Sequence, residues 1–160
     1  MATTKGFTLI ELVIVILILG ILAAFAVPKW LGKGGFETHT VSDEVVARLR
    51  LVQTINMNEP SKPSRADPNN ARQTFFQAKP GQFWHYSVAL VDGAVSAPIH
   101  IVNTGASVTL NGQSEFSIHF DKRSGRPLAP CVADCEILIS DGIENVRLRI
   151  EPEGYIHALP

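Results

Sequence analysis

Glu11 is the residue whose position most needs a chemical explanation, because it is the one charged side chain in the apolar run Phe7–Val27. That run has 21 residues, of which 18 are apolar. As a helix it would be about 31 Å long, which matches the hydrocarbon core of a bilayer. A carboxylate in hydrocarbon costs roughly 2.5–3.5 kcal/mol on insertion scales, so a carboxylate found there is by default a hypothesis of function.

Three interpretations of this run stay open on the residues alone. The first is a plain membrane anchor. The second is a secretory signal cleaved after Ala26, because Ala24-Phe25-Ala26 has the small-x-small pattern of a cleavage site and Lys5 supplies positive charge before the run. The run is, however, longer than a usual signal core and carries an acid. The third is a segment that uses Glu11.

Cys131 and Cys135 are the only two cysteines, too few for a disulfide framework but enough for one bridge. In an exported, oxidising setting we expect that bridge, with the role of stiffening an exposed loop before a strand. The entropic gain of closing so small a loop is modest. A metal site would need two further ligands, and a C-x₃-C pair alone is a weak signal of one.

No other pattern points to an enzyme, a cofactor or a metal. Five histidines are scattered without metal-ligand spacing, and no H-E-x-x-H, G-x-S-x-G, P-loop or G-x-G-x-x-G motif occurs. We therefore expect a protein that is not an enzyme, with ordinary histidines at the following positions: His39, His85, His100, His119 and His157.

The charge balance gives no reason to expect bulk binding of nucleic acid or anionic lipid, since the net charge is −1 and the pI is about 6.5. Lys122, Arg123 and Arg126 form a basic turn that can contact phosphates, although three charges in one turn usually belong to a solvated loop. The aromatic residues Phe83, Trp84 and Tyr86 can stack on a ligand, although such clusters more often belong to a core. We do not expect DNA as a partner.

Residues 28–58 are expected to form a stem helix with a weak beginning. Proline costs about 3 kcal/mol and each interior glycine about 1 kcal/mol, so Pro28 should interrupt the helix and the glycine-rich stretch up to Gly35 should be weak helix or loop. A second helix should start near Thr38, with apolar residues at three- and four-residue spacing on one face: Val41, Val45, Leu49, Val52 and Ile55. Residues 59–83, with four prolines and Asn69-Asn70, are expected to form a surface loop.

Residues 84–160 are expected to form a β-rich globular head. Period-two alternation predicts strands at 85–91, 95–102, 107–110, 114–121, 136–140, 146–151 and 155–159. Asp92-Gly93, Asn111-Gly112 and Asp141-Gly142 are typical hairpin turns. The expected fold is α+β: a long hydrophobic N-terminal helix, serving as anchor and stem, packed on an antiparallel β-sheet or small β-sandwich.

The segment Lys5-Gly6-Phe7-Thr8-Leu9-Ile10-Glu11-Leu12-Val13-Ile14-Val15-Ile16 closely resembles the class III signal of type IV pilins and type II secretion pseudopilins. The resemblance implies that residues 1–6 are a leader peptide, that a prepilin peptidase cuts between Gly6 and Phe7, and that Phe7 is then N-methylated. Residues 7–27 would be the transmembrane and filament-core helix. The family pattern further implies that Glu11 pairs with the N-terminal amine of a neighbouring subunit, which is positively charged at neutral pH.

Two C-terminal segments resemble minor pilins with a β-sandwich head. These are the strand and Gly-Arg-Pro turn at Phe116–Pro127 and the terminal hairpin at Asn145–Ile150 and Gly154–Ile156. The whole is most similar to a minor pilin of mannose-sensitive haemagglutinin-type pili. This implies a single-pass prepilin in the bacterial inner membrane with a periplasmic head, whose partners are other pilin subunits and the assembly machinery, and which initiates, caps or decorates an adhesive pilus. The alternatives are a minor pseudopilin in a periplasmic pseudopilus, a DNA-uptake pilin and a secreted β-sandwich protein.

Overall fold

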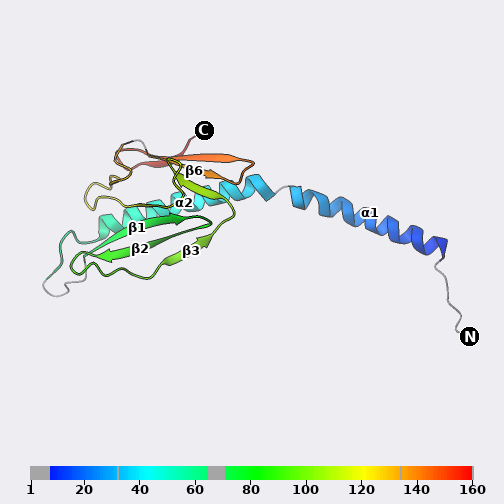
Figure 1. Cartoon of the computed structure of the whole chain (residues 1–160), viewed down its shortest axis with the longest axis horizontal. Helices are drawn as coiled ribbons and strands as arrows, with labels where there is room; N and C mark the ends of the chain where they lie inside the picture. Colours follow the sequence, from blue (N-terminus) through cyan, green and yellow to red (C-terminus); the bar gives the residue numbers. More distant parts are fainter. Residues whose placement is uncertain (1–7, 32, 65–70, 134, 160) are drawn as a thin grey trace, which may run out of the picture. The chain divides into compact units, whose positions relative to one another are not determined.

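The computed structural model describes residues 8–31, 33–64, 71–133 and 135–159, without the side chains of residues 24–36 (Figure 1). Two compact units are distinguished, residues 1–34 and residues 35–160. The leader peptide, Gly6 and Phe7 lie outside the described residues. The fold class is α+β, as the sequence predicts, with two helices and two antiparallel sheets in the described ranges.

Helix α1 (Leu9–Leu31) belongs to the first unit, and its large apolar side chains from Leu9 to Leu22 are 41–81% exposed. The expected interruption at Pro28 is wrong, because the helix continues to Leu31. Pro28 lies in the last turn of α1, so the hydrogen bond that it cannot donate is lost close to the end of the helix. Among the described residues, no helix is found that is both long and apolar enough to cross a membrane.

Helix α2 (Lys33–Asn58) begins earlier than the sequence predicts. Gly34 and Gly35 lie inside it, ahead of the expected start near Thr38. The helical cost of a glycine is only about 1 kcal/mol, and a helix that is already fixed by packing can extend over it. The predicted apolar face is confirmed, since its first four members are buried and the last is half-buried: Val41, Val45, Leu49, Val52 and Ile55.

The first sheet has the strand order β3-β2-β1-β5 and is antiparallel throughout. Its strands are β1 (Arg72–Lys79), β2 (Gln82–Ala89), β3 (Ile99–Asn103) and β5 (Phe116–Ile118). Strand β1 corrects the expectation that all of residues 59–83 form a loop. Thr74, Phe76 and Ala78 are buried at period two within it, and Pro80-Gly81 joins it to β2 with Gly81 at φ 77°. The prolines on either side concealed this alternation.

The second sheet has the order β4-β6-β7-β8 and is also antiparallel. Its strands are β4 (Ser107–Leu110), β6 (Cys135–Ser140), β7 (Asn145–Ile150) and β8 (Ile156–Ala158). The strand predictions in this part of the chain agree with the structure to within a few residues. The prediction for 95–102 does not, because only its end is strand, in β3, and Val95 forms a single bridge to Val88.

The core of the second unit lies where α2 meets the two sheets, and Figure 1 shows the α2 ribbon between them. One continuous cluster combines Val45 and Leu49 of α2, Phe76 of the first sheet, and Ile137 and Leu148 of the second, all with no exposed surface. Each sheet therefore buries one face against the same helix. This arrangement fixes the loops at both ends of the head relative to α2.

Candidate functional site

Thr8 and Glu11 cap the N-terminus of α1 by hydrogen bonding to each other. The Glu11 Oε2 atom accepts hydrogen bonds from the Thr8 backbone N–H and from its hydroxyl, both at 3.2 Å, and the Glu11 N–H donates to Thr8 Oγ1 at 3.3 Å. This is a capping box, in which a threonine and a glutamate three residues later satisfy donors that the first helical turn leaves free. The spacing Thr-x-x-Glu is visible in the sequence, and the sequence reasoning missed it.

The capping box determines where the Glu11 carboxylate lies. It holds the negative charge at the first turn of α1, where the positive end of the helix dipole stabilises an anion. Its backbone partner, Thr8 N–H, is one residue from Phe7, the expected mature N-terminus. The local structure therefore gives the carboxylate a partner within its own chain.

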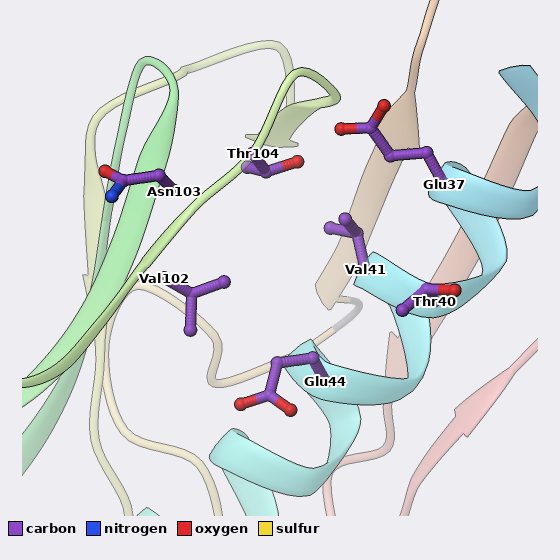
Figure 2. Close-up of a pocket in the computed structure, with 7 residues that line it drawn as sticks. All are labelled: Glu37, Thr40, Val41, Glu44, Val102, Asn103 and Thr104. Carbon is purple, nitrogen blue, oxygen red and sulfur yellow. The ribbon is translucent and has the colours of Figure 1, made fainter. Parts of the chain in front are cut away.

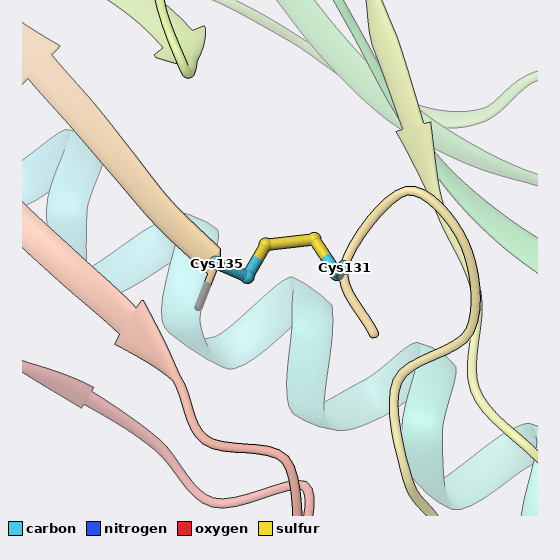
Figure 3. The surroundings of a disulfide bond; sticks show 2 residues. All are labelled: Cys131 and Cys135. Carbon is cyan, nitrogen blue, oxygen red and sulfur yellow. A yellow bond between two sulfur atoms is a disulfide. The ribbon is translucent and has the colours of Figure 1, made fainter. Parts of the chain in front are cut away.

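The two cysteines form a disulfide in the structure (Figure 3), with their Cα atoms 5.0 Å apart. Both are buried, at 0% and 1% exposure, and both belong to the core cluster. Cys135 is the first residue of β6, opposite Ile150 of β7. The expected role of stiffening an exposed loop is therefore incomplete: Val132 between them is exposed, but the bridge itself joins the loop to the core.

The two C-terminal segments singled out in the sequence meet at one side chain of α2. Gln53 Nε2 donates to the carbonyl oxygen of Gly125 at 2.7 Å and to that of Gly154 at 2.8 Å. Gly154 has φ 96°, and a Cβ atom on it would lie 2.3 Å from the Gly125 oxygen. Both glycines are thus required by backbone geometry and close approach, which explains them as structural residues.

Asn56 makes a similar connection to the other sheet. Fully buried, it donates from Nδ2 to the Thr74 carbonyl at 2.9 Å and accepts from the Thr74 N–H at 2.7 Å. The sequence analysis described only the apolar face of this helix, and it missed both Gln53 and Asn56. No local signal distinguishes them, because their partners lie 18 to 101 residues away.

Hydrogen bonds to the Asp121 side chain organise the backbone of the basic turn. Asp121 Oδ1 accepts hydrogen bonds from the N–H groups of Arg123 and Ser124 and from the Ser124 hydroxyl, at 2.7–3.1 Å. These bonds, first those from Ser124, lower the pKa of Asp121. Arg123 and Arg126 are exposed, and within the described residues their guanidinium groups make no hydrogen bond or ion pair.

A pocket of about 570 Å³ lies between the first turns of α2 and the end of β3 (Figure 2). Its lining consists of two carboxylates, two valines and three polar side chains: Glu37, Glu44, Val41, Val102, Thr40, Asn103 and Thr104. Figure 2 shows both carboxylates extending from α2 toward β3, on either side of the two valines. No sequence pattern predicted this pocket.

The aromatic cluster and the histidines divide between core and surface. Phe83 is buried in the core, whereas Trp84 and Tyr86 alternate to the other face of β2, where Tyr86 stacks on Phe75. His85 is buried, and desolvation lowers its pKa, followed by the effects of Arg48 and His100. Among the described residues, no group of three or more His, Cys, Asp or Glu side chains is arranged to hold a metal ion.

The family comparison concerns the N-terminal segment. Residues 1–27 match the model of the prokaryotic N-terminal methylation motif. No curated protein matches the chain, and no solved structure matches it. The matched residues end where the predicted apolar run ends, and they include Gly6, Phe7 and Glu11.

This motif indicates a type IV pilin-like prepilin. A chain of this class is processed by a prepilin peptidase and assembles with other pilin subunits. The α+β fold, with a long helix followed by an antiparallel β head, is consistent with that class.

Proposed function

We propose that this chain is a minor type IV pilin, a structural subunit without enzymatic activity that initiates, caps or decorates a pilus used for attachment. The observation that carries the proposal is the N-terminal methylation motif over residues 1–27. The carboxylate of Glu11 at the first turn of α1 supports it further. In this proposal residues 7–27 anchor the prepilin in the inner membrane and later join the filament core.

Two features of the second unit support a minor subunit. The Gly125–Pro127 turn and the Gly154–Ile156 segment, which resemble those of minor pilins, are connected through Gln53.

The apolar side chains exposed along α1, in the first unit, support assembly, because a helix that is apolar all round needs apolar surroundings, either lipid or other helices. The same motif serves minor pseudopilins of type II secretion systems, which is the alternative assignment.

The N-terminus of the mature protein tests the proposal. The full-length chain is purified from membranes of a host with a prepilin peptidase, and its intact mass and N-terminal sequence are measured. A chain that begins with N-methylated Phe7 is the expected result. A start at Val27 would indicate an ordinary signal peptide, and an intact Met1 would indicate a plain anchor; either would overturn the proposal.

Two glycine variants control the measurement. Gly6→Val places a branched side chain at the expected cleavage site and should leave the leader attached. Gly20→Val makes the same change on α1, where a Cβ atom meets nothing within 4 Å, and should be processed normally. Recovery of the protein in sheared pili, rather than with secretion machinery, separates the pilin from the pseudopilin.

A further inference from the structure

The three turns that the sequence predicts from an acid or amide before glycine differ in how their side chains are bonded. Asp92 Oδ1 accepts one backbone N–H at 2.9 Å, and Asp141 Oδ1 accepts two at 2.8 Å. The third turn has Asn111 in this position, and it is exposed. Within the ranges that the structure describes, the Asn111 side chain makes no hydrogen bond. Its amide is therefore unrestrained, unlike the two carboxylates.

The backbone at Asn111 and Gly112 forms a tight two-residue turn after β4. Leu110 and Gln113 exchange two N–H to carbonyl hydrogen bonds across it, both at 2.9 Å, and φ is 50° at Asn111 and 82° at Gly112. Positive φ at both central residues is the geometry of a type I′ turn. The Gly112 N–H makes no backbone hydrogen bond among the described residues, and a Cβ atom there would meet nothing within 4 Å. The nitrogen that follows the free amide is thus neither bonded nor shielded.

A free asparagine amide next to an unhindered backbone nitrogen can lose ammonia without a catalyst. The Gly112 nitrogen attacks Cγ of Asn111, the N–H proton leaves with the side-chain amide as ammonia, and a five-membered cyclic imide remains. Water then opens the imide. Opening at Cγ gives an aspartyl residue at position 111, and opening at the backbone carbonyl gives an isoaspartyl residue. The net change converts one amide and one water into a carboxylate and an ammonium ion, with no oxidation or reduction.

Glycine is the residue that most favours this attack, because it has no Cβ and permits a wide range of backbone rotation. Asn111 is the one asparagine of the seven in the chain that precedes a glycine. Asn103 and Asn145 are also exposed, but each precedes a β-branched residue whose side chain shields the backbone nitrogen. They are therefore the natural internal references for the reactivity of Asn111.

The turn itself opposes the reaction, because the attack requires the backbone to rotate out of it. The two bonds between Leu110 and Gln113 must break first. They lie at the end of β4, an edge strand of the second sheet that pairs with β6 on its other side. Local opening at such a place costs far less free energy than global unfolding. We propose that Asn111 deamidates spontaneously in the folded chain, during local openings of this turn.

The reaction places a negative charge where the chain has none. Residues 93–114, which include the edge strands β3 and β4, contain no Asp, Glu, Lys or Arg. Charge on an edge strand discourages its pairing with another chain. The isoaspartyl product also lengthens the backbone by one carbon, so it should break the bonds between Leu110 and Gln113. Deamidation therefore changes the β4 edge progressively with time after synthesis.

Peptide mapping of the full-length protein tests the proposal. The purified chain is incubated at slightly alkaline pH and digested at mildly acidic pH, which limits conversion during digestion. Mass spectrometry with electron-transfer fragmentation then locates the products and distinguishes aspartyl from isoaspartyl residues. We expect both products at position 111, formed at least tenfold faster than at Asn103 or Asn145. No product at position 111, or equal rates at the three positions, would overturn the proposal.

Two glycine variants test the route through the imide. Gly112→Ala places a Cβ atom beside the attacking nitrogen and should slow the conversion of Asn111 at least fivefold. Gly142→Ala makes the same change in the Asp141 turn, at φ 87° and again with nothing within 4 Å, and should leave the rate at Asn111 unchanged. An undiminished rate in the Gly112 variant would rule out attack by this nitrogen.

The same incubation in urea separates the folded chain from the bare sequence motif. The unfolded chain should convert Asn111 faster, because the turn no longer restrains it, but the folded chain should still convert it well ahead of Asn103. Conversion confined to the unfolded chain would mean that the turn protects Asn111 and would contradict the proposal. None of these outcomes depends on the mature N-terminus, so this inference and the proposed function stand or fall separately.

Discussion

Thr8 and Glu11 hold each other across the first turn of α1 through three hydrogen bonds of 3.2–3.3 Å. The carboxylate therefore has a polar partner before any subunit joins it, which offsets part of the cost of an acid beside an apolar helix. In the proposed pilin, assembly would give the same carboxylate a stronger partner, the charged amine of a neighbouring chain. The capping box would then position the acid in advance of that exchange.

Replacing Glu11 should block assembly without blocking membrane insertion. Glu11→Ala removes the charge that the amine would bind, and it also removes an apolar helix's only carboxylate, so insertion should be unchanged or better. We expect the variant in membranes at the wild-type amount and at least tenfold depleted from sheared filaments, by quantitative immunoblot. Thr8→Val is the matched control: it breaks the capping box, at about 1 kcal/mol, but keeps the charge, and should assemble. Wild-type incorporation of the alanine variant would refute the assembly role of Glu11.

The fixed approach of Gly154 to Gly125 makes Gly154 the least replaceable of the glycines whose surroundings the structure describes. Gly154→Ala forces a Cβ atom to 2.3 Å from a backbone oxygen at φ 96°, so the free energy of unfolding should fall by roughly 3 kcal/mol or more. Gly112→Ala has a similar φ of 82° with nothing within 4 Å, and should cost only about 1 kcal/mol. Urea unfolding of the full-length chain, followed by tryptophan fluorescence, measures both. Equal losses would show that the close approach contributes nothing.

The side chain of Asn56 should contribute far more to the free energy of unfolding than that of Asn58. Asn56→Ala leaves the N–H and carbonyl of buried Thr74 without partners, which should cost about 2–4 kcal/mol for two unsatisfied groups. Asn58→Ala removes an exposed bond to the Thr54 carbonyl at the helix end and should cost under about 1 kcal/mol. The same unfolding measurement compares them, and a loss below 1 kcal/mol for Asn56→Ala would contradict the connection between α2 and β1.

The sequence predicts the elements whose signals are local and misses the contacts that connect them. The period-two alternation of Val146, Leu148 and Ile150 is enough to place β7, and the spacing of Val41, Val45 and Leu49 is enough to place the buried face of α2. Gln53 and Asn56 carry no such signal, because what makes them important is backbone brought to them from distant strands.

Some parts of the candidate site can be predicted from the sequence, and others cannot. Glu11 is conspicuous because its charge contradicts its surroundings, and Cys131 pairs with Cys135 because no other cysteine exists. The pocket is not predictable, since Glu37 and Val102 come together only when β3 is placed beside α2. Strand β1 was missed for a different reason. The prolines on either side of residues 72–79 are strong local signals of a loop, and they outweigh the period-two alternation between them.

The head should lose stability as the pH falls below about 6.5, and His85 should be a main cause. Burial is the largest effect that lowers its pKa in the folded state, and Arg48 of α2 and His100 of β3 lower it further. The unfolded chain, with an ordinary histidine pKa near 6.5, therefore binds more protons than the folded one once the pH falls below that value. Each such histidine contributes at most about 1.4 kcal/mol of lost stability per pH unit, and nothing above the unfolded pKa.

His85→Gln should remove this contribution. Urea unfolding of the full-length wild type at pH 7.5, 6.5 and 5.5 should show a progressive loss, and the slope between pH 6.5 and 5.5 should be smaller in the variant. A residual slope is expected from His119, whose pKa is also lowered by burial. Asn58→Ala, which changes an exposed side chain of α2 that does not titrate, is the control and should keep the wild-type slope. If His85→Gln keeps it as well, protonation of His85 is not what destabilises the head.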